Sequence, residues 1–469
     1  MGQEAIPVLT DALAIGLVLD WFIKLIWRHC AGINQINCWL DMIRISLRYC
    51  LLATLLALLI ACRATAHEEL QSVSLVVTNG TVIDGTGVEP IADGFVAIQG
   101  DRIVAVGQSA DFKIPDEATV IDAAGGTILP GVINSHVHTA STPATRRHLF
   151  LLDGVTSVCD LGIPLSLMED LEQESSQSGL AARGFKAGPI VTAPGGYPGP
   201  YFGFSINYEV QGADQAEMAV RDLHARGADY IKVALEPGLE GANLPVITLQ
   251  ELRSIVASAH EYDLLVRTHV TKGTMLSIAL KAGTDVLEHV PLPSDSFVDL
   301  ESMFDEAGVF YLPPELEAQL RQVIDQGIVL VPTLDVMIGE KNQHGDIDPE
   351  TNVLNQATLG VVRFFHESGG IIAVGNDYGN PSVHPGMPLR EMELLQTAGL
   401  SPLKVIQAAT QHAAYVCGQS EQLGTLERGK LADLIVVAGN PLDDLNALDS
   451  VLYIVKNGEI VVSPHQESK

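Results

Sequence analysis

The sequence predicts an α/β protein in which a (β/α)8 TIM-like barrel is accompanied by a small β-sandwich domain formed by both ends of the mature chain. Apolar runs that alternate with helical stretches fill the middle of the chain, as in a parallel barrel. Short segments of strand character lie before and after that region. With 469 residues, 47% of them apolar and 18% charged, the chain can bury a large core.

The two ends of the mature chain carry the sandwich prediction. Five short segments with turn residues between them predict a small antiparallel sheet, at 75–78, 81–83, 95–99, 102–106 and 119–122. Segments 432–437 and 452–458 return to strand character near the C-terminus, with a hairpin turn at Asn457-Gly458. We therefore expect the sandwich to combine residues 67–128 with residues 413–469.

The barrel is expected over residues 129–412. Eight apolar runs are candidate parallel strands, at 128–135, 156–161, 189–193, 230–235, 264–269, 285–289, 328–333 and 371–376. Helical patterns such as 215–226, 249–262 and 355–368 separate them. Active sites of such barrels lie at the C-terminal ends of the strands, so residues that end these runs are the first candidates for function.

Residues 1–66 read as a leader, an upstream extension followed by a signal peptide. Arg44 and Arg48 form a basic region after Met42, and residues 50–61 form an apolar core. Two cleavage sites compete: a lipobox in which Cys62 would be lipidated, which we favour, and an A-x-A site before His67. We expect an exported protein, periplasmic or anchored to the membrane as a lipoprotein in a bacterium.

The first 41 residues are harder to interpret. Segment 6–27 is apolar enough to suggest a membrane helix, but Asp11, Asp20 and Lys24 interrupt it, and charges at such depths are costly. We interpret residues 1–41 as an upstream extension, with the natural chain beginning at Met42.

Charge and cysteine content exclude several classes of partner and site. The net charge of -30 falls outside residues 1–61, where four acidic and four basic residues cancel. So acidic a surface repels phosphate backbones, which argues against nucleic acid and for a small-molecule substrate. A homo-oligomer is also expected. Only Cys159 and Cys417 lie outside the leader, too few for a disulfide framework or a cysteine-rich zinc site.

Four histidines stand at ends of the candidate strands. His136 and His138 are two residues apart on one strand, so both imidazoles point to the same side. His269 and His289 end the fifth and sixth strands, at the same mouth. The histidines on predicted helices are interpreted as surface residues or satisfied core residues: His224, His260 and His366.

Asp377 and Lys232 complete the candidate metal set. Asp377 follows the eighth strand, which adjoins the first when the barrel closes, so its carboxylate reaches the same metal and can accept a proton from bound water. Lys232 lies on the fourth strand between apolar residues. An ammonium would be repelled by divalent cations, whereas a carbamate would bridge two of them. Taken alone, Lys232 is better explained as a lysine at the mouth of the barrel with a surface role.

The order of these motifs over residues 75–462 resembles the amidohydrolase superfamily, in the branch of imidazolonepropionase-like and Xaa-Pro-dipeptidase-like proteins. Two motifs carry most of the resemblance: Pro130-Gly131-x4-His136-x-His138 and the run Leu423-Gly424-Thr425 through Ala432-Asp433-Leu434. The resemblance also covers the glycine-rich segment 78–87, Lys232, Thr268-His269, Glu288-His289 and Asn376-Asp377.

The resemblance implies two divalent metal ions, often zinc, bridged by a hydroxide and by carbamylated Lys232. It implies that His136, His138 and Asp377 hold the first ion, and His269 and His289 the second. The hydroxide would attack a carbonyl, and Asp377 would pass its proton to the leaving group.

The expected reaction is hydrolysis of a C-N bond, amide or peptide, in a dipeptide, N-acyl amino acid or cyclic amide. Hydrolysis of a lactone or an organophosphate ester is the first alternative. A non-catalytic metal-binding barrel is the second, and it would be marked by loss of a ligand, which the sequence does not show.

Departures from the resemblance bear on the substrate. Deaminases and imidazolonepropionases usually carry a glutamate three residues after the strand-five histidine, where this chain has Lys272. Dipeptidase-like relatives often show Gly-Gly-His where this chain has Gly195-Gly196-Tyr197. We expect Tyr197, Tyr378 and His384 to be substrate contacts.

Overall fold

The structure is a computed structural model that describes residues 73–138, 144–168, 179–238, 242–293, 300–338 and 349–464. The predicted leader, with Cys62 and both cleavage sites, lies outside the described residues. Among the helices within these ranges, none combines the length and apolar character that crossing a membrane requires.

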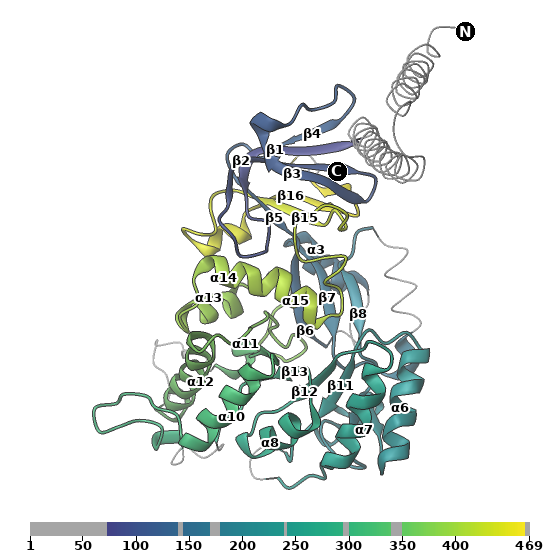
Figure 1. The fold of residues 1–469 in the computed structure, drawn as a ribbon, viewed down its shortest axis with the longest axis vertical. Coiled ribbons are helices and arrows are strands. Elements are labelled where there is room, and N and C mark those ends of the chain that lie inside the picture. The colour runs from purple at the N-terminus through teal and green to yellow at the C-terminus, as the bar shows by residue number, and fades with distance from the viewer. Residues whose placement is uncertain are drawn as a thin grey trace, which may run out of the picture. The chain divides into compact units, whose positions relative to one another are not determined.

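Strands from both ends of the chain share one eight-stranded sheet, seen at the top of Figure 1. The order is β17-β16-β15-β5-β1-β2-β3, with β4 also paired to β1. The strands are β1 (Leu75–Val82), β2 (Ile91–Gln99), β3 (Arg102–Gln108), β4 (Thr119–Asp122), β5 (Thr127–Pro130), β15 (Leu434–Val437), β16 (Val451–Lys456) and β17 (Glu459–Val462). The meeting of both ends agrees with the sequence, while a two-layered sandwich stays a prediction.

The pairing within this sheet differs from the antiparallel prediction. β1 pairs antiparallel with β2 but parallel with both β4 and β5, because the chain returns from β3 to the opposite edge of β1. The hairpin between β16 and β17 is as predicted: Asn457 and Gly458 both adopt positive φ, 52° and 75°, which a tight two-residue turn requires.

The predicted first barrel strand, 128–135, is in fact two strands. β5 belongs to the sheet of the chain ends, and β6 (Val132–Val137) begins a parallel sheet. Gly131 lies between them, where a Cβ atom would approach Thr156 Oγ1 to 2.2 Å. Only glycine fits this crossing, and an apolar run alone does not reveal it.

The barrel region contains two parallel sheets. One has the order β6-β7-β8 and the other β10-β9-β11-β12-β13-β14. Their further members are β7 (Val155–Asp160), β8 (Arg183–Lys186), β9 (Ile190–Thr192), β10 (Asn207–Glu209), β11 (Ile231–Ala234), β12 (Val266–His269), β13 (Val286–Glu288) and β14 (Val329–Val331). The sequence missed β8 and β10, which are short and contain polar residues.

The predicted eighth strand, 371–376, is not a regular strand, but its backbone joins the two sheets. Leu330 N donates to Ile371 O at 2.9 Å, and Ser135 N donates to Val374 O at 3.0 Å. Asp377 N then donates to His136 O at 2.9 Å. Asp377 therefore lies beside the end of β6. Closure of all strands into one barrel stays a prediction.

Amphipathic helices cover the parallel strands, and Figure 1 shows α6, α7 and α8 flanking β11 and β12. The larger helices of the barrel region are α3 (Ala144–Leu152), α6 (Ala213–Ala225), α7 (Leu249–His260), α8 (Gly273–Ala282), α10 (Pro314–Asp325), α12 (Pro349–Glu367) and α13 (Leu389–Thr397). Thr248 and Glu251 form a capping box that begins α7, and Leu252, Ile255 and Ala259 bury one face of it.

The two cysteines outside the leader pair with each other, which the sequence analysis did not consider. Cys159 of β7 and Cys417, which follows α15 (Ala413–Val416), form a disulfide between buried sulfur atoms. The bond joins residues 258 positions apart and ties the end of the barrel region to its second strand. Sequence reasoning looked for a framework of several disulfides and overlooked a single one.

Candidate metal centre

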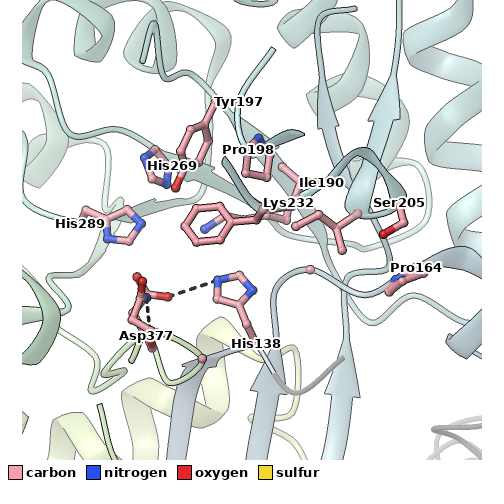
Figure 2. Close-up of a pocket in the computed structure, with 15 residues that line it drawn as sticks. His138, Pro164, Ile190, Tyr197, Pro198, Ser205, Lys232, His269, His289 and Asp377 are labelled. Carbon is pink, nitrogen blue, oxygen red and sulfur yellow. Dashed lines mark hydrogen bonds and ion pairs between the residues drawn. The ribbon is translucent and has the colours of Figure 1, made fainter. Parts of the chain in front are cut away.

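Five of the six predicted metal ligands line one cavity where the parallel strands end, and the sixth, His136, contacts Asp377. His136 and His138 come from β6 and the residue after it, Lys232 from β11, His269 from β12, His289 from the residue after β13, and Asp377 from the residue after segment 371–376. Figure 2 shows His138, Lys232, His269, His289 and Asp377 facing one another. The His269 and His289 ring centroids are 4.2 Å apart, and those of His136 and His289 are 5.1 Å apart.

The Asp377 carboxylate contacts both His136 and His138. Its Oδ1 atom lies 3.3 Å from His136 Nε2 and 3.2 Å from His138 Nε2. Burial would raise the pKa of Asp377, but the adjacent imidazoles outweigh it and hold that pKa well below its usual value. The carboxylate is therefore ionised and able to bind a cation or accept a proton.

The site has the donors and the unsatisfied atoms of a metal centre. Ligand atoms of His136, His289 and Asp377 lie within 4.8 Å of one another. Lys232 Nζ and His269 Nε2 are buried and make no hydrogen bond within the described part of the chain. Buried polar atoms without partners are costly, and imidazole and carboxylate donors suit divalent ions such as zinc. The residues present therefore fit divalent metals.

Burial keeps the imidazoles of His269 and His289 neutral. It lowers the pKa of His269 and of His289 well below the usual value, with a further contribution from neighbouring cationic groups. His289 Nδ1 lies 2.7 Å from Thr333 Oγ1, which leaves Nε2 for another partner. Neutral imidazoles present the lone pair that a metal requires.

Lys232 differs from a surface lysine. Its side chain is fully buried, and this burial lowers the pKa of its amine to about 8, although the Glu288 carboxylate opposes the shift. An amine in this range has a neutral fraction near neutral pH, which is the form that reacts with carbon dioxide. The mouth lysine with a surface role, an alternative that the sequence left open, does not fit this burial.

Glu288 and Arg267 form a buried ion pair that sequence reasoning did not assign. Glu288 Oε2 lies 2.7 Å from His136 Nδ1, and Arg267 Nε donates to Glu288 Oε1 at 2.7 Å. Burial would raise the pKa of Glu288, but Arg267, Lys232 and His136 together outweigh it and hold that pKa well below its usual value. The carboxylate then accepts from His136 Nδ1, which directs His136 Nε2 at Asp377. The sequence feature that could have revealed this ion pair is one charged residue within each of two otherwise apolar strands.

Three residues at this mouth adopt left-handed backbone conformations. The φ angles are 72° for His289, 50° for Thr333 and 59° for Asp377. Such angles are uncommon outside glycine and cost about 1–3 kcal/mol each. Each lies where the backbone leaves a strand or its equivalent, so these turns direct the side chains toward the centre.

The cavity beside the ligands has a volume of about 400 Å³. Its lining residues are His138, Gly162, Pro164, Ile190, Tyr197, Pro198, Phe202, Ser205, Ile206, Lys232, His269, His289, Asp377, Gly379 and Asn380. The ring of Tyr197 lies 4.7 Å from that of His269, centroid to centroid. Tyr197 is therefore placed where a substrate would lie, and its contact with substrate stays a prediction.

Two expected substrate contacts lie elsewhere. Tyr378 is buried, and its ring packs edge-on against Phe150 of α3 with centroids 5.1 Å apart. It belongs to the hydrophobic core, which corrects its assignment to the cavity. His384 is exposed and is not among the lining residues. His260, by contrast, is exposed as expected and pairs with Asp285.

Lys272, three residues after His269, contacts the loop that follows β11. Its Nζ donates to Gly238 O at 2.8 Å and lies 3.8 Å from Glu236 Oε1. The other oxygen of Glu236, Oε2, lies 3.6 Å from His269 Nε2. A carboxylate thus approaches His269 from the loop after β11, in the region where the sequence shows a lysine in place of a glutamate.

An α/β fold with such a cluster at the ends of parallel strands is typical of TIM-like barrels that bind metals. The chain belongs to the amidohydrolase family, whose model matches residues 127–461. The fold of this family implies a TIM-like α/β barrel for the chain. Proteins of the family are hydrolases and generally bind metal ions.

Three similar proteins indicate the branch. Ochratoxinase of Aspergillus niger is 28% identical over 276 residues, or 56% of this chain, and the match spans about half (52%) of that protein. Imidazolonepropionase of Alkaliphilus metalliredigens is 23% identical over 79% of this chain and 91% of its own. A crystal structure of a Xaa-Pro dipeptidase with bound methionine superposes with a TM-score of 0.68 at 23% identity, covering 82% of this chain and 99% of that one. At this identity the structural match shows the fold alone.

Proposed function

We propose that the protein is a binuclear metal-dependent amidohydrolase that cleaves a C-N bond, amide or peptide, in a small substrate such as a dipeptide, an N-acyl amino acid or a cyclic amide. The observation that carries the proposal is the buried, unpartnered Lys232 amine among four histidines and Asp377. A lysine that acted as a cation here would need a hydrogen-bonded carboxylate, and the described residues provide none to Lys232 Nζ, which disfavours that role.

The residues suggest how two ions would be held. His136, His138 and Asp377 would bind one ion, His269 and His289 the other, and carbamylated Lys232 would lie between them. The nitrogen and oxygen donors suit zinc. When bound, two divalent ions would lower the pKa of a water molecule and polarise the substrate carbonyl.

The chain's own residues would handle the proton and the substrate. Asp377 is ionised, lines the cavity, and would take a proton at Oδ1 and return it to the leaving nitrogen. Burial raises the pKa of Tyr197, so its hydroxyl stays protonated and can donate to a substrate oxygen. The Glu288 carboxylate, held by Arg267, would keep His136 in one tautomer.

The relatives favour a C-N bond over an ester. Their names, Xaa-Pro dipeptidase and imidazolonepropionase, refer to peptides and to a cyclic amide. A non-catalytic barrel is disfavoured because five of the six residues line one cavity and the sixth, His136, contacts Asp377. No feature of the cavity favours a lactone or an organophosphate ester.

Replacement of Lys232 tests the proposal. In Lys232→Ala we expect bound metal to fall from two equivalents toward one and most activity to be lost, with propionate restoring part of the turnover. A small carboxylate can occupy the vacated space and supply the anionic bridge. The measurements are metal analysis and amide hydrolysis rates with and without propionate. Lys281→Ala, at an exposed position of α8, is the matched control. Unchanged metal content with wild-type turnover in Lys232→Ala would remove Lys232 from the site.

We also propose that the protein is exported. The predicted signal peptide supports this, and the disulfide between Cys159 and Cys417 supports it independently, since disulfides persist in oxidising compartments. Mass spectrometry of protein from the native host should find an N-terminus at lipidated Cys62 or at His67. Intact Met1 in a cytosolic fraction would contradict export.

A further inference from the structure

We propose that Tyr201, Phe202 and Phe204 form an aromatic mouth that binds a large apolar group of the substrate, so that the enzyme prefers amides carrying an aromatic or bulky hydrophobic substituent. The inference rests on the proposed amide hydrolysis and narrows its substrate class. The three residues lie on α5 (Gly199–Phe202) and on the short helix that follows it, Phe204–Ile206.

The cavity has two chemically different ends. His269, His289 and Asp377 lie at one end in Figure 2, and Pro164, Ile190 and Ser205 lie at the other. The lining residues beyond the metal centre are mostly apolar: Pro164, Ile190, Pro198, Phe202 and Ile206. A scissile bond at the first end would therefore direct one of its substituents along an apolar wall.

The aromatic mouth consists of three exposed aromatic side chains that are close together in the sequence. Tyr201 is 43% exposed, Phe202 58% and Phe204 55%, within four consecutive positions. Phe202 also lines the cavity, so it belongs to both the wall and the surface. Contiguous exposed apolar surface beside a cavity marks a binding region.

The rings connect this surface to the metal centre. The centroid of Tyr197 lies 6.3 Å from that of Phe202 and 5.8 Å from that of Tyr201, and Tyr197 contacts His269 in turn. Aromatic rings at such separations favour offset or edge-on contacts. A planar group that extends from the scissile bond could continue this series of contacts.

Charge restricts the substituent further. Among the described residues that line the cavity, charged side chains belong only to the metal centre, and Ser205 is the polar residue that Figure 2 shows at the far end. A carboxylate or ammonium there would lose its hydration without gaining a partner. The volume of about 400 Å³ also exceeds what an acetyl group needs.

The experiment compares substrates that differ in one group. N-acetylalanine is compared with N-(2-naphthoyl)alanine and with N-acetyl-2-naphthylalanine, which place the ring on the acyl or the amine side. We expect the kcat/KM of the zinc-loaded enzyme for one of the two naphthyl substrates to exceed that for N-acetylalanine by about tenfold or more. Phe202→Ala should lose that preference, because the KM of the naphthyl substrate should rise more than that of N-acetylalanine. Tyr415→Ala, which removes an exposed aromatic ring from α15, is the control.

A binding assay separates this inference from the proposed reaction. N-(2-naphthylsulfonyl)alanine and N-methylsulfonyl-2-naphthylalanine resist hydrolysis, and calorimetry compares each with N-methylsulfonylalanine. Tighter binding of a naphthyl probe that Phe202→Ala abolishes supports the aromatic mouth, even if no amide is cleaved and the proposed function fails. Equal binding of all three probes, or a naphthyl preference that survives in both Phe202→Ala and Phe204→Ala, overturns it.

Discussion

Glu288 connects the stability of the fold to the geometry of the metal centre, and Glu288→Gln tests both. The substitution keeps the shape of the side chain and removes its charge, while Arg267 stays fully buried. The guanidinium keeps its bonds to Ser135 O at 2.7 Å and Val416 O at 3.2 Å, but no anion remains beside it. Removing one partner of a buried pair costs about 3–5 kcal/mol, a large part of a typical stability of about 5–15 kcal/mol.

The same change should weaken metal binding. A glutamine cannot accept from both His136 Nδ1 and Arg267 Nε as two carboxylate oxygens do, so the His136 ring loses its orientation. Loss of such a partner lowers metal affinity about 10–100-fold. Urea unfolding of the metal-free protein measures the first effect, and zinc titration against a competing chelator measures the second.

Two further variants make this test decisive. Glu393→Gln removes an exposed carboxylate of α13 and should change neither quantity. If Glu288→Gln does not fold, Glu288→Asp retains the charge and should fold with weakened zinc binding. Wild-type unfolding and wild-type zinc affinity in Glu288→Gln would refute the assigned role.

Glu391 should make the protein less stable as pH rises, because burial raises its pKa in the fold from 4.5 to about 8. Its contribution to stability is complete below pH 4.5 and is lost as the pH rises to 8. Between these pH values the loss in the free energy of unfolding approaches about 5 kcal/mol as an upper bound. The free energy of unfolding of Glu391→Gln in urea should therefore vary less with pH than that of the wild type. An identical pH dependence of the two proteins would contradict this prediction. For the disulfide, Cys417→Ser should lower the free energy of unfolding by about 2–5 kcal/mol, and peptide mapping without reductant should recover a Cys159–Cys417 cross-link from the wild type. Free thiols at both positions in the purified protein would count against it.

The sequence indicated which candidate metal ligands lie close together because their placement follows a local rule. In a parallel α/β fold, a polar residue that ends an apolar run lies at the C-terminal mouth, and His269, His289 and Asp377 obey this rule. The Glu288 and Arg267 pair depends instead on register between neighbouring strands. Arg267 is aligned with Val286, and His269 with Glu288, so the pair is diagonal across the sheet. Such an alignment is set by packing of the whole sheet, and a single sequence does not specify it.

Tyr378 shows why adjacency to a ligand is a weak guide to the site. Asp377 adopts a left-handed conformation, with φ of 59°, and the backbone of Tyr378 then pairs with Val137 and accepts from His138 N at 2.6 Å. This turn directs the Asp377 carboxylate to the imidazoles, while the next side chain packs against Phe150. The place of Tyr378 in the loop after the predicted eighth strand had suggested a substrate contact. The backbone conformation that places the first residue in the site directs the second into the core, so each residue after such a turn has to be assigned on its own contacts.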